Sequence, residues 1–154
     1  ATFLPIYVTS GVEAKLYGSE LQAELYITEQ LKFTASGSYT IGELENGSPL
    51  PQIPPLKGLI ELSYASDQLI TGISIELANS QKKLDQFEEY TAGYAVANAF
   101  VQYSFESGET IHNMSLTVDN ILNKEYRNHL SRVKSIMPEA GRNFRLTYKL
   151  YFHI

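Results

Sequence analysis

The final segment of the chain, residues 141–154, alternates between apolar and polar side chains over an unusually long stretch. Its apolar members are Phe144, Leu146, Tyr148, Leu150 and Phe152. Successive side chains of a β-strand point to opposite faces, so the segment predicts one apolar, aromatic face and one polar, basic face. Ordinary strands have about 5–6 residues, whereas a strand that crosses a membrane needs about 9–11. The pattern is therefore typical of a membrane-spanning strand with lipid on one side and water on the other.

Six further segments show the same alternation of apolar and polar side chains. They cover residues 12–28, 31–41, 60–64, 72–77, 90–105 and 113–119. Together they predict an all-β fold, an antiparallel transmembrane β-barrel segment of about seven long strands. A soluble β-sandwich would show the same alternation, but its strands are usually shorter than the roughly 10–17 residues expected here.

The connections between these segments alternate between short and long. The short connections are residues 28–30, 65–68 and 106–108, and the long ones are residues 42–55, 78–89 and 121–140. In an up-and-down sheet, alternate connections lie at the same end, so all long loops share one end. This arrangement is typical of a barrel with tight periplasmic turns and long outer loops.

The composition excludes several classes of protein. A net charge of −5 without a basic block argues against nucleic-acid binding through a basic patch. The chain has no Cys, which excludes disulfides and thiolate metal sites. No window approaches about eighteen consecutive apolar residues, so no transmembrane helix is expected. A mean hydropathy of −0.17 resembles that of a soluble protein, but alternation conceals the apolar surface of a barrel.

The longest loop, residues 121–140, contains a basic cluster of Arg127, His129, Arg132 and Lys134. Guanidinium and ammonium groups suit an anionic ligand, such as a ferric siderophore or lipopolysaccharide phosphates. We predict these four residues as candidate ligand-binding residues. The alternative is a solvated loop surface without a ligand.

No set of residues predicts catalysis, and we expect neither enzymatic activity nor a cofactor. Acidic residues recur on the polar side of the strands, at Glu20, Glu24, Glu61, Glu76 and Asp119. A hydrated lumen or contact with a plug domain explains them without acid–base chemistry. Neither a G-x-S-x-G elbow nor a phosphate-binding glycine loop occurs. The separated His112 and His153 do not predict a metal site.

Four stretches resemble the C-terminal portion of TonB-dependent outer-membrane receptors. They are residues 118–126, 141–144, 51–58 and 18–20. The first reads Val-Asp-Asn-Ile-Leu-Asn-Lys-Glu-Tyr and is similar to the family's V-x-N-L-F-N-K-x-Y. The second, Gly-Arg-Asn-Phe, resembles the start of the family's closing strand, although His153 and Ile154 follow the usual terminal aromatic residue.

This resemblance implies that residues 1–154 are the C-terminal part of a barrel of about 22 strands, whose plug domain is absent from the chain. It implies a Gram-negative outer-membrane location and uptake of a scarce ligand, most often a ferric siderophore or other metal chelate. The implied partners are outer-membrane lipid, the rest of the barrel with its plug, and the TonB complex.

Two alternatives remain open at this point. A small self-contained barrel with a structural or pore role would need residues 1–10 as an eighth strand, although Pro5 and the small residues that follow favour a loop. A soluble β-sandwich binding module would instead bury its apolar faces against each other. The start of the chain has no signal-peptide pattern, which is expected of an internal piece of a longer protein.

Overall fold

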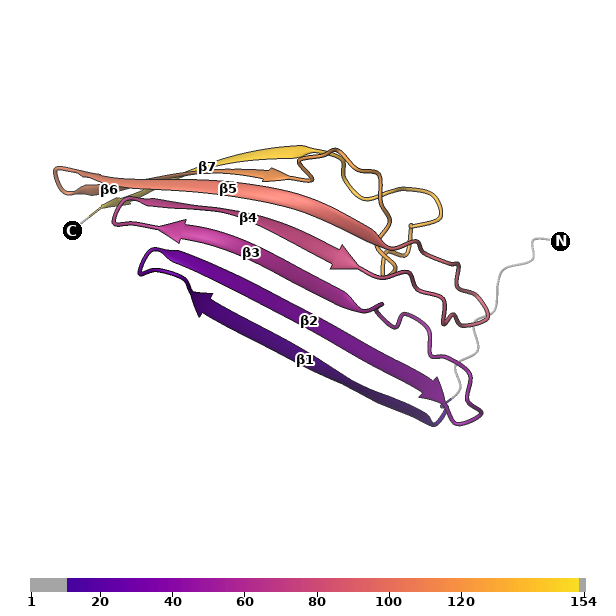
Figure 1. Ribbon diagram of the computed structural model, residues 1–154. Helices are drawn as coiled ribbons and strands as arrows, with labels where there is room; N and C mark the ends of the chain where they lie inside the picture. Colours follow the sequence, from indigo (N-terminus) through magenta and orange to yellow (C-terminus); the bar gives the residue numbers. More distant parts are fainter. Residues whose placement is uncertain (1–10, 153–154) are drawn as a thin grey trace.

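The computed structural model describes residues 11–152, which form a single antiparallel sheet (Figure 1). The strands are β1 (Ala14–Tyr26), β2 (Leu31–Leu44), β3 (Lys57–Ala65), β4 (Leu69–Ala78), β5 (Tyr94–Ser107), β6 (Thr110–Asp119) and β7 (Asn143–Phe152). Each strand pairs with its neighbours in sequence, in the order β1-β2-β3-β4-β5-β6-β7. The predicted all-β, up-and-down architecture is confirmed.

The two ends of the sheet differ in the way that the sequence predicts. Short turns join β1 to β2, β3 to β4 and β5 to β6, whereas long loops precede β3, β5 and β7. Figure 1 shows the three turns at one end and the three loops at the other. The loop end therefore gathers residues 45–56, 79–93 and 120–142.

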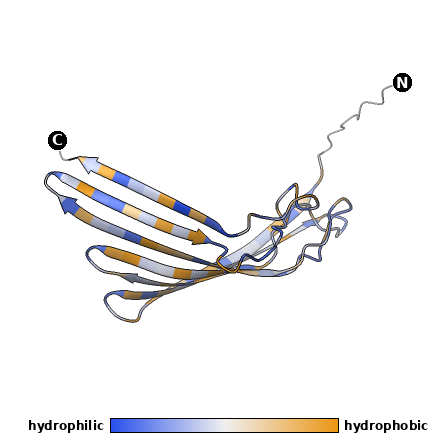
Figure 2. Cartoon of the chain, turned by 90° about the horizontal axis from the view of Figure 1, so that it is seen from above, coloured by the Kyte–Doolittle hydropathy of each residue, from blue (hydrophilic) through white to orange (hydrophobic). Residues whose placement is uncertain are grey.

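The register places most apolar side chains of the strands on one face. One row across the sheet pairs Ala35 with Ile60, Ile60 with Ile75, and Ile75 with Ala97. Figure 2 shows the resulting alternation of hydrophobic and hydrophilic residues along the strands. Apolar side chains on this face stay exposed, for example Leu21 at 76% and Leu146 at 71%.

The opposite face is polar across the same strands. The adjacent row pairs Glu24 with Thr34, Thr34 with Glu61, and Glu61 with Ser74. Lys32 lies 3.8 Å from Glu24 on this face. The sheet thus separates one mainly apolar surface from one mainly polar surface, since side chains alternate along every strand.

The small buried core lies at the loop end of the polar face. It consists of Ala78, Tyr94 and Val96, with Tyr126 of the last loop packed against them. The first loop also folds back onto the sheet, because a Cβ at Gly42 would lie 2.5 Å from the side chain of Ile53. Loop packing rather than sheet packing therefore provides the buried contacts.

Several predicted boundaries need correction. β1 begins at Ala14 and ends at Tyr26 instead of covering residues 12–28. β5 begins at Tyr94 rather than at residue 90, because Thr91 pairs with Gln81 in an isolated bridge that belongs to the preceding loop. The strands are 9 to 14 residues long, somewhat shorter than expected.

The β-sandwich interpretation is wrong for the described residues, which form one sheet and not two. The eighth strand required by a small barrel falls on residues 1–10, outside the described residues. His153 and Ile154 also lie outside them. Within residues 11–152, no helix is long and apolar enough to cross a membrane.

Candidate functional site

The three long loops are connected to one another by hydrogen bonds at the loop end of the sheet. The Gln81 side-chain amide donates to the Ile53 carbonyl at 2.9 Å. The backbone N–H of Gln52 donates to Glu88 Oε1 at 2.7 Å. Both bonds join residues 45–56 to residues 79–93. The middle loop contacts the third loop through Thr91, which lies 2.9 Å from His129.

Tyr94 and Tyr126 attach the third loop to the polar face of the sheet. Their ring centroids lie 4.5 Å apart at a tilt of 48°. The Tyr94 hydroxyl donates to Glu76 Oε1 at 2.8 Å. Burial raises the pKa of the Tyr126 phenol, and the nearby carboxylates of Glu76 and Glu139 raise it further. Tyr126 therefore stays neutral as it packs over the sheet.

Asn120 holds the start and end of the third loop together. It has a positive φ of 51°, a conformation that Asn adopts more readily than most residues, and it is only 2% exposed. Its side-chain oxygen accepts from the Lys124 N–H at 2.8 Å, and its amide donates to the Lys124 carbonyl at 2.8 Å. The same amide donates to the Ala140 carbonyl at 3.3 Å.

Asn123 makes a second connection across the base of this loop. It also has a φ of 51°, and its side-chain oxygen accepts from the Arg142 N–H at 2.9 Å. A Cβ at Gly141 would lie 2.7 Å from that oxygen, so a larger residue there would displace the Asn123 side chain. The stretches at residues 118–126 and 141–144 are therefore explained by loop geometry.

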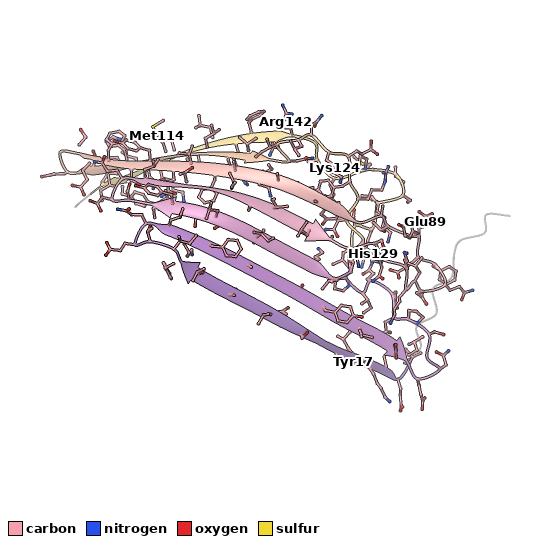
Figure 3. The ribbon with its side chains drawn as sticks, viewed as in Figure 1. Tyr17, Glu89, Met114, Lys124, His129 and Arg142 are labelled. Atoms are coloured by element: carbon pink, nitrogen blue, oxygen red, sulfur yellow. The ribbon has the colours of Figure 1, made fainter. Side chains whose placement is uncertain are left out.

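His129 lies at the junction of the loops (Figure 3). It is only 3% exposed. Its Nδ1 lies 2.9 Å from Thr91 Oγ1 and 3.1 Å from Lys134 Nζ. Its Nε2 lies 3.5 Å from Glu88 Oε1 and has no closer polar partner among the described residues.

The neighbours of His129 determine its protonation state. The Lys134 ammonium is a donor only, so its contact requires an unprotonated Nδ1 that accepts. It also donates to the His129 carbonyl at 2.9 Å. Burial lowers the pKa of His129, the Lys134 charge lowers it further, and Glu88 acts in the opposite direction. His129 is therefore a neutral imidazole at pH 7 with its proton on Nε2.

A small cavity of about 250 Å³ opens beside this junction. Its lining includes Arg132, Lys134, Glu88 and His129. Cations from one loop and a carboxylate from another thus border the same space. A ligand there would meet both charge signs, which suits a chelate that has both anionic and cationic groups.

The structure brings three of the four predicted residues together. His129, Arg132 and Lys134 line the cavity, whereas Arg127 is outside it. Arg127 forms an exposed ion pair with Glu125 at 3.0 Å and donates to the Lys134 carbonyl at 2.9 Å. His129 is buried, whereas Arg127 and Arg132 are exposed, and ligand binding by these residues stays a prediction.

Sequence reasoning missed the partners from the other loops, Gln52, Glu88 and Thr91. Thr91 and His129 are separated by 38 positions, and no local pattern marks either as one of a pair. That loop contains adjacent acidic residues at 88 and 89, but also adjacent lysines at 82 and 83, so its charges do not single out Glu88. In the part of the chain that the structure describes, no cluster of three or more His, Cys, Asp or Glu could hold a metal ion.

Known proteins that resemble this chain are found among solved structures. No protein-family model matches the chain, and no curated protein matches it. Among solved structures, the chain is similar to "Copper transporter OprC", with 27% sequence identity and a TM-score of 0.81. The match covers 93% of this chain and 23% of that chain. The chain therefore shares its fold with part of a transporter and spans less than a quarter of its length.

Proposed function

We propose that this chain is the C-terminal part of the β-barrel of a TonB-dependent receptor in a Gram-negative outer membrane. The whole receptor takes up a scarce metal, as a chelate or as an ion. The transported metal is cargo and not a resident cofactor. The apolar face of the sheet contacts lipid, the polar face borders the lumen, and the three long loops face the outside.

The observation that carries this proposal is the exposed apolar face shared by all seven strands. Soluble proteins rarely expose apolar patches larger than about 300–600 Å². Here apolar residues such as Ile60, Ile73 and Leu116 continue from strand to strand without a covering layer in the described residues. Lipid is the partner that suits such a surface in a chain whose other face is polar.

The height of the apolar face also supports a membrane location. Phe144 and Phe152 mark the two ends of this face on β7. A rise of about 3.3 Å per residue places them about 26 Å apart along the strand. A tilt of about 40° reduces this to about 20 Å along the barrel axis, close to the roughly 25 Å apolar band of outer-membrane barrels.

The unpaired edges of the sheet support the proposal that further strands of the same barrel pair with β1 and β7. In the described residues, β1 pairs only with β2, and β7 pairs only with β6. An unpaired strand edge in lipid leaves backbone N–H and C=O groups without partners, at several kcal/mol for each group. The remaining strands of a closed barrel, about 22 in the resembling family, would satisfy both edges.

The nature of the cargo is supported by the loop end and by the structural neighbour. The neighbour is called a copper transporter. The receptor family that the sequence resembles implies a ferric siderophore or another metal chelate as the alternative. Arg132, Lys134 and His129 border a cavity at the outer end of the proposed lumen. These residues suit an anionic group of a metal chelate. The plug domain and the TonB-binding segment would lie in the remaining part of the receptor.

The first experiment is the intact mass of the native polypeptide in the outer-membrane fraction of the source cell. The proposal expects a mass several times 17.3 kDa, the mass of this chain. A membrane-bound polypeptide near 17.3 kDa would support the small self-contained barrel instead.

Uptake assays then test transport. Cells that lack the native gene, and separately cells that lack TonB, should lose accumulation of the same labelled substrate, chosen from copper ions and ferric siderophores. Restoring the gene should restore the uptake. If uptake of every tested substrate were unchanged in both deletion strains, the proposed function would be contradicted.

A further inference from the structure

We propose that His129 forms a pH-sensitive latch, which holds the long loops together while its imidazole is neutral and releases them when it gains a proton. The latch links residues 79–93 to residues 120–142, and Glu88 extends the linkage to residues 45–56. The proposal goes beyond transport and does not depend on the identity of the cargo.

Thr91 does not distinguish between the two protonation states. Its hydroxyl lies 2.9 Å from Nδ1 and can either donate to a bare nitrogen or accept from a protonated one. Thr91 is itself 5% exposed, so the pair is buried inside the closed junction. The response to pH must therefore come from burial of the ring and from the charged neighbours.

Lys134 is the neighbour that opposes protonation. Its Nζ lies 3.1 Å from Nδ1, and an ammonium group can only donate. A proton on Nδ1 removes this hydrogen bond and places two positive charges side by side in a buried position. Because like charges disfavour ionisation at short range, Lys134 must move away when His129 is protonated.

The remaining charged groups at the junction have opposing effects on the protonation of His129. Glu88 Oε1 lies 3.5 Å from Nε2 and favours the imidazolium. That oxygen already accepts the Gln52 N–H, while Oε2 accepts the Asp85 N–H at 3.2 Å, so Glu88 is held by its own loop contacts. Glu89 and Arg132 line the adjacent cavity with opposite charges. Burial and Lys134 together outweigh Glu88, and the lowered pKa of His129 agrees with this balance.

The direction of the pH effect follows from linkage. The opened loops expose an imidazole with a pKa near 6.5, whereas the closed junction holds a lower pKa. Opened molecules therefore bind more protons, and the closed state loses stability as pH falls below about 6.5. The open-to-closed ratio should rise by up to about tenfold for each pH unit until the lower pKa is reached.

The test is a distance measurement between two loops in the native polypeptide, kept in its own outer membrane. Cysteines replace Phe87 and Ile136, which are 87% and 78% exposed in the middle and third loops, and both receive spin labels. These 154 residues have no native Cys, so both labels in them are introduced. Pulsed electron resonance then gives the distance distribution from pH 8.0 to about 5.5, above the ordinary titration range of Asp and Glu.

The expected result is one narrow distribution at pH 8 and a growing broad component below about pH 6.5. His129→Gln, which cannot gain a proton, should remove the growth of this component. Lys134→Met should reduce it, since the like charge is lost while burial of the ring remains. Lys124→Met is the matched control in the same loop and should behave as the native protein, because its side chain lies away from His129 (Figure 3).

Two results would overturn the latch. One is a native distance distribution that does not change with pH. The other is broadening at low pH that persists unchanged in either His129→Gln or Lys134→Met. Because the readout is a loop distance and not uptake, failure of the latch leaves the transport assays unaffected, and failure of transport leaves the distance result valid.

Discussion

The apolar face of the sheet and the junction of the long loops follow opposite rules of burial. On the sheet, residues such as Leu21 and Leu146 are exposed, and no described layer covers them. At the loop junction several buried residues are polar, among them Asn120, Thr91 and His129, and they lie beside the small apolar core. A protein surrounded by water would show the reverse, since apolar burial is its main stabilising contribution. The proposed membrane location accounts for this difference, because it places lipid around the sheet and water around the loops.

The largest expected effect comes from a charge placed on the apolar face. Ile75→Arg should reduce the stability of the native polypeptide in lipid vesicles by about 2–4 kcal/mol, because an arginine near the membrane centre is poorly solvated. Ser74→Arg, one residue earlier on the polar face, should change it by less than about 1 kcal/mol. Reversible unfolding in denaturant measures both. Equal losses of stability in the two variants would contradict the proposal that the two faces have different surroundings.

Loss of the Asn120 side chain tests the polar junction. Asn120→Ala should destabilise the third loop by about 2 kcal/mol, because it removes the hydrogen bonds of a buried side chain to Lys124 and Ala140. Asn128→Ala removes an exposed bond to the Leu130 N–H and should cost about 0.5 kcal/mol. Hydrogen exchange of residues 120–142 gives both values. Similar protection in the two variants would show that burial of Asn120 contributes little.

A smaller effect is expected at the base of the loops. Tyr94→Phe removes the hydroxyl that donates to Glu76 and should cost about 1–2 kcal/mol, since the acceptor is a carboxylate. Tyr103→Phe removes an exposed hydrogen bond to Gln68 at 3.1 Å, at the turn end, and should cost less than about 0.5 kcal/mol. Unfolding of the two variants in the same vesicles provides the comparison. A larger loss of stability from Tyr103→Phe than from Tyr94→Phe would contradict this prediction.

The smallest effect is expected for the ion pair between Arg145 and Asp119. Its closest atoms are 3.5 Å apart, and both side chains are exposed. Asp119→Asn should change stability by less than about 0.5 kcal/mol, because water screens exposed pairs. The change should shrink further in high salt. A loss above about 2 kcal/mol would mean that the polar face is much drier than a hydrated lumen.

The sheet was predictable from the sequence because its signal is local. Alternation alone identified all seven strands and assigned residues such as Phe33, Ile60 and Ile73 to one face, since strand periodicity does not depend on distant residues. The start of β5 was misplaced because the bridge between Gln81 and Thr91 depends on how the loop folds back.

The loop junction was only partly predictable. The basic character of residues 127–134 was evident, and Lys134 does contact His129. The burial of His129 depends on Thr91 and Glu88, which reach it from another loop through the folding of the whole sheet. Contacts of this kind have no periodic signature, and composition alone favours the exposed reading of a polar loop.

The central claim is that the apolar face lies in lipid and the polar face borders water. Single spin labels at Met114, Ser115, Leu116 and Thr117 of β6, in the native polypeptide in its membrane, test it directly. The account predicts that labels at 114 and 116 collide mainly with oxygen dissolved in lipid, while labels at 115 and 117 collide mainly with a water-soluble nickel complex. Equal access of the nickel complex to all four positions would contradict the membrane-spanning account.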